Sequence, residues 1–180
     1  MKTPLILLVV SAFICALGFL VPAWSDALLV GVPCAIASLW LLWRAWRAPN
    51  WVIVDGSNVM HWKKGVPDIG PVRDVLAVLA HQGFTAGVMF DANAGYKLFN
   101  KYKHDHAFSR LLDLPQNRIM VVPKGTPADP YILTAARDYK ARIVTNDQFR
   151  DWVDDFPEIL SPGFLIKGGY QNNQLLLGLS

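Results

Sequence analysis

Two long apolar runs occupy most of the first 43 positions of the chain. Residues 4–21 (PLILLVVSAFICALGFLV) and 27–43 (ALLVGVPCAIASLWLLW) contain no charged residue. Each run is close to the roughly 20 residues that cross the apolar core of a bilayer as a helix. Only residues 22–26 separate the two runs, which leaves room for a tight reversal. The pattern predicts a hairpin of two transmembrane helices, at about residues 4–21 and 27–46.

The charges around these runs predict their orientation. Lys2 precedes the first run and Arg44 and Arg47 follow the second, whereas the turn between them carries only Asp26. Basic residues favour the cytoplasmic side of a membrane. We therefore expect a multi-pass protein of the inner (cytoplasmic) membrane, a lipid bilayer as one partner, and a cytoplasmic domain after Pro49.

A cleaved signal peptide is the alternative interpretation of residues 1 to about 23, because Lys2 followed by an apolar core fits that description as well. The apolar run is long for a signal peptide, and no clear small-x-small cleavage site follows it. Under either interpretation the second run would stop translocation and leave the rest of the chain in the cytoplasm.

From residue 51 onward the pattern changes to short apolar runs that alternate with segments of helical period. Such alternation is typical of a parallel sheet with crossover helices, so the predicted fold class is α/β. We predict a membrane anchor at residues 1–49 and one domain at 50–180. The predicted strands are 51–55, 85–91, 119–123 and 141–147. The predicted helices are 70–83, 93–114 (one helix, or two that meet near Asp105), 129–140 and a short one within 148–156. We also predict a terminal hairpin at 163–179 that turns around residues 170–173.

Charge and cysteine content narrow the chemistry of residues 50–180. The chain totals of 17 Lys and Arg and 14 Asp and Glu, less three basic and one acidic residue before Asn50, leave 14 and 13. A net charge near +1 means that nucleic-acid binding would need a local patch. Both cysteines, Cys15 and Cys34, lie in the apolar runs. A disulfide framework and a cysteine zinc site are therefore excluded for residues 50–180.

Acidic residues stand at the ends of the predicted strands and the starts of the following helices: Asp55, Asp91, Asp129, Asp147 and Asp151. Each has a purely structural alternative; Asp129, for example, is expected to cap the helix that has Pro130 in its first turn. In open parallel sheets, however, ligands bind at the carboxyl ends of the strands. If the first and fourth strands are neighbours, these acids share one pocket.

A pocket of this kind predicts a metal ion. Two carboxylates about 4 Å apart repel by roughly 4 kcal/mol at an effective dielectric of 20, so a cluster of them requires a cation. Oxygen ligands favour Mg²⁺ or Mn²⁺. Such an ion orients a water and stabilises charge on a phosphoryl group, which is the chemistry of a metal-dependent phosphodiesterase. Asn58 is expected to position substrate or water instead of binding metal.

Three motifs, VIVDGSNVMH, TPADPYIL and RIVTNDQFRDW, resemble the PIN-like ribonucleases of the NYN and Regnase type. They occur in the order of that family, and the resemblance covers about residues 51–168. It implies a three-layer α/β/α sandwich with a mainly parallel sheet, and Mg²⁺-dependent cleavage of single-stranded RNA. Carried over residue by residue, it implies a catalytic centre of Asp55, Asn58, Asp129, Asp147 and Asp151, in which the four aspartates bind the metal.

The sequence also departs from the Regnase pattern. Those enzymes often have two adjacent acids where this chain has Ala128 and Asp129, so one ligand is missing or is replaced by Asp91. Asp91 lies in FDANAGYK, which resembles segments of bacterial members of the group. Its role is left open between metal binding through water, contact with substrate and support of its loop.

Basic and aromatic residues alternate after the second predicted strand, from Tyr96 to Arg110. Basic side chains for phosphates and aromatic rings for bases are what a single-strand binder uses; the alternative is a solvated helix face. The expected substrate contacts are Asp91, Lys97, Lys101, Lys124 and Arg150.

These observations predict a membrane-anchored, Mg²⁺- or Mn²⁺-dependent endoribonuclease with RNA as its partner. The alternative from a different class is a membrane-tethered RNA-binding or interaction module with the same fold but little turnover. A structure-specific DNA nuclease is a third interpretation, although the chain is short for the insertions that thread a strand. The sequence leaves open whether the chain forms a homo-oligomer.

Overall fold

Residues 2–63 and 65–179 are described by the computed structural model, and the chain divides into two units at the Pro49–Asn50 junction. The first unit consists of helix α1 (Lys2–Leu20), a 3₁₀ turn η1 (Pro22–Ala27) and helix α2 (Leu28–Trp46). The two predicted apolar helices and the tight reversal between them are thus confirmed as secondary structure. The side chain of Lys2, which the orientation argument uses, lies outside the described part.

Small and polar side chains lie between α1 and α2, and large apolar ones point outward. Gly31 allows the close approach, since a Cβ there would lie 2.7 Å from Sγ of Cys15. Ser11 and Ser38 are buried, and each hydroxyl donates to the carbonyl four residues earlier at 2.7 Å. Large side chains such as Phe13, Phe19 and Leu29 are exposed. Both helices are long and apolar enough to cross a membrane.

The second unit is built on a five-stranded sheet in the order β3-β2-β1-β4-β5, and every neighbouring pair in it is parallel. Its strands are β1 (Asn50–Asp55), β2 (Phe84–Phe90), β3 (Ile119–Val121), β4 (Arg142–Val144) and β5 (Leu165–Ile166). Its helices are α3 (Gly56–Val59), α4 (Gly70–His81), α5 (Ala94–Phe99), α6 (Asp105–Leu112) and α7 (Asp129–Tyr139), with 3₁₀ turns η2 (Gln116–Arg118), η3 (Arg150–Trp152) and η4 (Pro157–Leu160).

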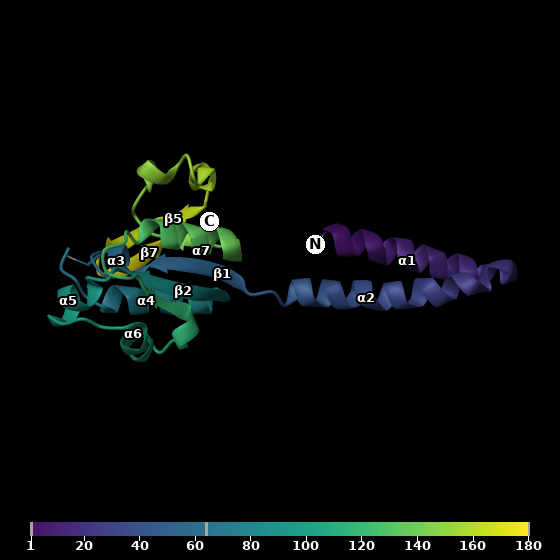
Figure 1. Ribbon diagram of the computed structural model, residues 1–180, viewed down its shortest axis with the longest axis horizontal. Helices are drawn as coiled ribbons and strands as arrows, with labels where there is room; N and C mark the ends of the chain where they lie inside the picture. Colours follow the sequence, from purple (N-terminus) through teal and green to yellow (C-terminus); the bar gives the residue numbers. More distant parts are fainter. Residues whose placement is uncertain (1, 64, 180) are drawn as a thin grey trace. The chain divides into compact units, whose positions relative to one another are not determined.

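Helices cover both faces of this sheet (Figure 1), with α4 and α6 on one face and α7 on the other. Side chains along β1 alternate accordingly: Val52 and Val54 join the core beneath α4, and Ile53 joins the core beneath α7. A strand buried on both faces reads as a continuous apolar run. The predicted α/β class and three-layer arrangement are confirmed.

The segment 93–114 forms two helices, the second of the two predicted alternatives: Asn100 ends α5 in the left-handed conformation (φ 55°), and α6 begins at Asp105. Two other predicted elements differ in detail. The terminal hairpin begins later than expected: β5 joins the main sheet, and only β6 (Gly168–Gln171) and β7 (Gln174–Leu177) form the antiparallel pair. The segment 148–156 contains the 3₁₀ turn η3 where a short helix was expected.

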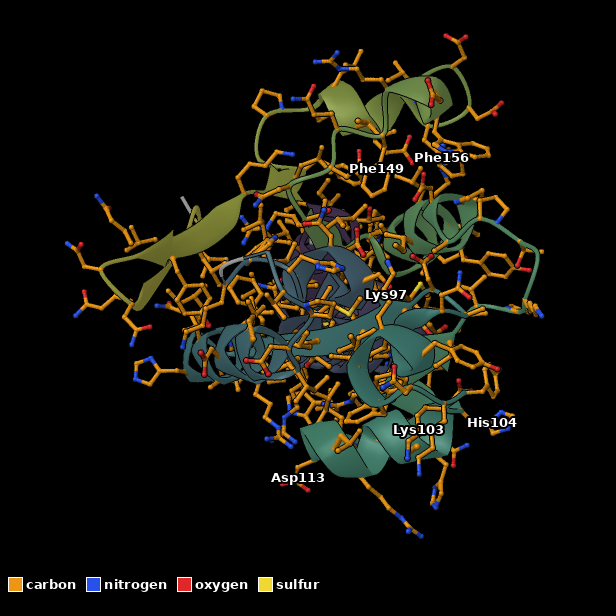
Figure 2. The ribbon with its side chains drawn as sticks, turned by 90° about the vertical axis from the view of Figure 1, so that its left-hand side faces the viewer. Lys97, Lys103, His104, Asp113, Phe149 and Phe156 are labelled. Atoms are coloured by element: carbon orange, nitrogen blue, oxygen red, sulfur yellow. The ribbon has the colours of Figure 1, made fainter. Side chains whose placement is uncertain are left out.

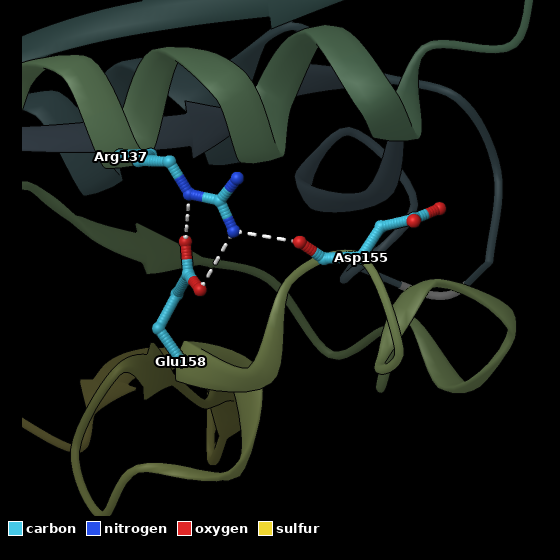
Figure 3. A network of polar contacts seen from close by, with 3 residues as sticks. All are labelled: Arg137, Asp155 and Glu158. Carbon is cyan, nitrogen blue, oxygen red and sulfur yellow. Dashed lines mark hydrogen bonds and ion pairs between the residues drawn. The ribbon is translucent and has the colours of Figure 1, made fainter.

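The segment that contains η3 and η4 is held against α7 by Arg137 (Figure 3). Its guanidinium donates to both carboxylate oxygens of Glu158, at 2.7 and 2.9 Å, and to the backbone carbonyl of Asp155 at 2.7 Å. The hydrogen bond from Arg137 lowers the pKa of Glu158. This clamp connects α7, which begins at Asp129, to the segment that includes Asp151.

Candidate active site

The carboxyl ends of three neighbouring strands bring the acidic residues to one edge of the sheet. β1 ends at Asp55, Asp91 directly follows β2, and Asp147 comes three residues after β4. β1 lies between β2 and β4, with Asp55 paired to Met89 and Val54 paired to Val144. The condition that the first and fourth strands be neighbours is therefore met.

Asp55 is the most enclosed of these acids, with 7% of its surface exposed. Oδ1 accepts the backbone N–H of Asn58 at 3.0 Å, and Oδ2 accepts the hydroxyl of Thr145 at 3.0 Å. Burial raises the pKa of Asp55 to about 6; the two hydrogen bonds oppose this shift, and the charges of Asp91 and Asp129 add to it. A carboxylate whose pKa is raised by burial and by like charges is a candidate functional group.

The side chain of Asn58 is fixed through its oxygen. Oδ1 accepts the indole N–H of Trp62 at 2.8 Å and the backbone N–H of Asn146 at 3.0 Å. Both lone pairs of that oxygen are thus engaged, and the amide nitrogen is left as a donor. Asn146 is held in turn, because its amide group exchanges hydrogen bonds with the backbone of Gly168 at 2.8 and 3.2 Å.

Thr145 connects the first and fourth strands at this edge. Its hydroxyl donates to Asp55 and accepts the backbone N–H of Asp147 at 3.0 Å. Oδ1 of Asp147 accepts the backbone N–H groups of Gln148 and Phe149, at 2.6 and 3.0 Å. One oxygen of Asp147 is therefore held by its own loop, and Oδ2 remains to face a ligand.

Asp129 does not cap α7 as predicted. The residue at the cap is Ala128, in a helical conformation, and Asp129 is already the first residue of the helix. Its carboxylate instead accepts the indole N–H of Trp152 at 3.2 Å. Burial raises the pKa of Asp129 against the effect of the Trp152 hydrogen bond, and the charges of Asp147, Asp91 and Asp151 raise it further. Asp129 is thus electrostatically coupled to the acids of the strand ends.

Asp151 reaches the site from the turn η3, which the chain enters through Phe149 in the left-handed conformation (φ 48°). Asp147 and Asp151 line one polar hollow of about 570 Å³, together with Asn58, Asn146, Gln148 and Arg150. Arg150 Nε donates to the side-chain oxygen of Gln148 at 2.7 Å. The hollow therefore has both acidic and basic side chains at its margin.

The donor set suits a hard divalent cation. Asp55 and Asp129 both have raised pKa values in part because neighbouring carboxylates repel them, and a cation would relieve that repulsion. In the geometry of residues 2–63 and 65–179, no three Asp, Glu, His or Cys side chains are close enough together to hold one ion. The residue types at this edge, carboxylates with an amide beside them, are those that a hard cation prefers.

The expected substrate contacts lie around the same edge. Asp91 is held through its N–H, which donates to the hydroxyl of Ser57 at 2.8 Å. Figure 2 shows this end of the second unit, with Lys97 in front of the sheet. Lys97 and Lys101 are exposed on and just after α5, and Lys124 is exposed in the loop between β3 and α7.

Sequence reasoning missed five residues that hold Asn58 or the acids in place: Trp62 and Asn146 at Asn58, and Thr145, Trp152 and Lys167 at the acids. The Lys167 ammonium donates to the backbone carbonyl of Asp147 at 2.5 Å. Burial lowers the pKa of Lys167, and the charge of Asp147 opposes that shift. The motif VTND and the Trp of FRDW were visible in the sequence, but nothing in them indicates which acid each side chain contacts.

A parallel α/β sheet with acids at its carboxyl edge defines a class of α/β proteins with a ligand site at the strand ends, and comparison with known proteins identifies the family. Residues 49–161 match the family described as the Zc3h12a-like Ribonuclease NYN domain. The match covers more than half of the chain, which therefore belongs to this ribonuclease family. No curated protein matches the chain.

Two solved structures of proteinaceous RNase P 2 (PRORP2) from Arabidopsis thaliana share the fold. Both match with a TM-score of 0.53 and 20% sequence identity, covering 78% and 87% of this chain. The chain spans about a third of their length, 32% and 35%. At this identity the likeness concerns the fold alone.

Proposed function

We propose that this chain is a membrane-anchored endoribonuclease that hydrolyses phosphodiester bonds of single-stranded RNA with Mg²⁺ or Mn²⁺. Membership in a ribonuclease family supports the reaction class. The observation that carries the proposal is that Asp55, Asp91 and Asp147 stand at or just after the ends of three neighbouring parallel strands, with Asp147 and Asp151 lining one hollow. The charges of neighbouring acids also raise the pKa values of Asp55 and Asp129. A fold that gathers five carboxylates without a cation would be destabilised by their repulsion.

The cation would be held by Asp55, Asp129, Asp147 and Asp151. When bound, it supplies a positioned water and stabilises negative charge on the phosphoryl group. The rigid supports of Asp55 and Asp147 matter here, because ligands held by their own hydrogen bonds need little rearrangement to bind. Asp91 is assigned to substrate or to support of its loop.

The other side chains at the edge position the RNA. Asn58 has its oxygen engaged, so its amide N–H groups are directed to a phosphate oxygen or to the attacking water. Arg150 at the hollow, with Lys97, Lys101 and Lys124, neutralises phosphates on either side of the scissile bond. The water oxygen would form the new bond to phosphorus as the bond to the leaving sugar oxygen breaks. One water proton would pass to solvent or to a carboxylate, and the leaving oxygen would take up a proton from solvent to become a hydroxyl.

The anchor is proposed for residues 1–49 and the nuclease domain for residues 50–180. Support comes from the packing of α1 and α2, in which Ser11 and Ser38 are buried and large apolar side chains are exposed, the reverse of the arrangement in a water-soluble helix pair. In a membrane the outer surface of a helix pair is apolar, and small residues allow close contact. The basic residues Arg44 and Arg47 after the second helix support a cytoplasmic nuclease domain.

The test uses the full chain in detergent micelles with a labelled single-stranded RNA. We expect cleavage with Mg²⁺ or Mn²⁺, none with chelator, and none from Asp147→Asn, while DNA of the same sequence is cut poorly. Asp154→Asn, an exposed aspartate in the same segment, is the matched control and should cleave normally. Cleavage that persists in chelator, or in Asp147→Asn, would remove the mechanism.

A membrane-tethered RNA-binding module with little turnover is the second candidate. Ala128 favours it, since this residue is 6% exposed and packs in the core at the position of the absent second acid. Binding of RNA by the full chain with no metal-dependent product would select this function.

A further inference from the structure

Three exposed rings lie close together on the segment that follows β2. Tyr96 is 51% exposed and Tyr102 38% exposed, and their ring centroids are 6.3 Å apart. The ring of His104, also exposed, meets that of Tyr102 edge-on at 4.6 Å. We call these three residues the aromatic platform. Phe90 and Phe108, by contrast, are buried and stack on each other at 4.2 Å in the core.

The backbone holds the platform in shape before any ligand binds. α5 ends at Asn100, where the left-handed conformation reverses the chain. The returning loop packs against Gly95: a Cβ there would lie 2.6 Å from the backbone nitrogen of Lys103 and 2.8 Å from the carbonyl of Lys101. The missing side chain of Gly95 thus allows Tyr102 to lie beside Tyr96. A preformed surface loses little conformational entropy on binding.

The charge of this segment complements a phosphate backbone. Lys97, Lys101 and Lys103 alternate with the rings, and Lys103 lies 5.4 Å over the ring of Phe99. Asp105 is the one acidic residue from 92 to 112 in the sequence, and its carboxylate accepts the backbone N–H of Val121 at 2.8 Å. Against this one carboxylate the segment carries Lys97, Lys101, Lys103 and Arg110, so its net charge is positive.

The platform lies at the same end of the sheet as the acids. Tyr96 comes five residues after Asp91, which contributes to the raised pKa values of both Asp55 and Asp129. Figure 2, viewed onto this end, shows Lys97 in front of the sheet and Lys103 and His104 beside one another below it. A strand bound at the platform would continue toward the carboxylates.

We propose that Tyr96, Tyr102 and His104 stack on consecutive unpaired bases of the RNA substrate, while Lys97, Lys101 and Lys103 contact the phosphates between them. The inference rests on the proposed nuclease function for the position of this site relative to the cut. Stacking uses the face of a base, which is covered in a duplex and free in a single strand. The platform thereby makes the chain select unpaired RNA without reading its sequence.

Binding is measured on the full chain in detergent micelles, with Asp147→Asn present in every protein to prevent turnover. The probe is a short oligoadenylate with one 2-aminopurine, whose fluorescence falls when the base stacks. Tyr96→Ala and Tyr102→Ala should each weaken binding by about tenfold and restore the fluorescence. Tyr96→Phe and Tyr102→Phe keep the ring and should stay within about twofold of the parent.

Two controls separate stacking from charge and from general damage. Tyr139→Ala alters a tyrosine on α7 outside the platform that is 52% exposed, close to the 51% of Tyr96, and should leave binding unchanged. Lys101→Ala should reduce the slope of log K against log salt by about 0.7, whereas the tyrosine variants leave that slope as it is. Thermal unfolding checks that each variant remains folded.

Each outcome decides the proposal. The proposal would be overturned if the Ala and Phe variants lost binding equally, or if Tyr139→Ala lost as much. It would also be overturned if duplex RNA bound as tightly as single-stranded RNA, or if polyglutamate, a polyanion without bases, competed fully with the RNA. Cleavage is measured separately with Mg²⁺ on chains that keep Asp147. RNA that binds through the tyrosines but is not cut by the chain with Asp147 would refute the nuclease function alone. Cleavage by that chain at a rate that Tyr96→Ala and Tyr102→Ala leave unchanged would refute the platform alone.

Discussion

The substitution Asp55→Asn should stabilise the cation-free protein while abolishing its activity. Burial raises the pKa of Asp55 from 3.8 to about 6, so the folded state holds this proton more tightly than the unfolded state. Such a group contributes stability below the unfolded pKa and loses it as pH rises through the folded value. The ionised Asp55 therefore destabilises the folded wild-type chain at neutral pH, and the asparagine variant lacks this destabilisation.

The magnitude follows from the shift. A difference of about 2 pKa units corresponds to about 3 kcal/mol once the group is ionised in both states. Asparagine keeps the contact to Asn58, since its oxygen accepts that N–H, and it reverses the contact to Thr145, since its amide donates to the hydroxyl oxygen. A protonated Asp55 reverses the same contact, so the asparagine variant corresponds to the protonated wild type. Asp55→Asn should thus exceed wild type by up to about 3 kcal/mol at about pH 8, and match it near pH 4.

Pulse proteolysis in urea, on the full chain in micelles with chelator, measures the unfolded fraction of the second unit at each pH. Both proteins are compared at the same pH, so other titrating groups cancel in the difference. Asp154→Asn, which changes an exposed aspartate, should show no pH-dependent gain. A variant no more stable than wild type at about pH 8, or one that still cleaves RNA with Mg²⁺, would refute the reasoning.

Three further predictions concern the same edge of the sheet. Asp147→Asn and Asp151→Asn should each lower metal-dependent cleavage by at least about 100-fold in a single-turnover assay, with unchanged thermal unfolding in chelator; unaltered rates would exclude them as ligands. Mg²⁺ should raise the unfolding midpoint of wild type in proportion to ln(1 + [Mg²⁺]/Kd) and leave that of Asp55→Asn nearly constant, as a titration by pulse proteolysis would record; equal gains would place the ion elsewhere. Trp62→Phe removes the 2.8 Å donor to Asn58 and should cost about 1 kcal/mol of stability and reduce kcat more than it changes KM; loss confined to KM would contradict a positioning role.

Much of the fold was predictable because burial dictates residue type along each element. The run WVIVD is apolar throughout because helices cover both faces of β1, and the helical period of residues 70–81 follows from one face packing on the sheet. The cap of α7 was mispredicted for a local reason. Asp at a helix start favours capping, but here Ala128 is already helical and the Asp129 carboxylate has Trp152 as a partner.

The acids of the candidate site were visible in the sequence, and their supports were not. Each carboxylate at a strand end could be recognised in the sequence by itself, because it follows an apolar run that predicts a buried strand. Thr145 and Asn146, by contrast, contact Asp55 and Asn58 across 90 and 88 positions of the chain. Such pairs depend on strand order, which local pattern does not specify.

The sequence by itself determined the two apolar helices, the change of composition at Pro49, the α/β alternation and the acids at the strand ends. These features can be predicted from residue type and spacing, because the burial of each element selects apolar residues at the period of that element. Only the tertiary structure decided that β1 lies between β2 and β4, that Asp55 is buried and carries a raised pKa, and that Tyr102 lies beside Tyr96 over Gly95. Each of these depends on contacts between segments far apart in the chain or on a loop that folds back, where packing geometry and mutual repulsion set the outcome.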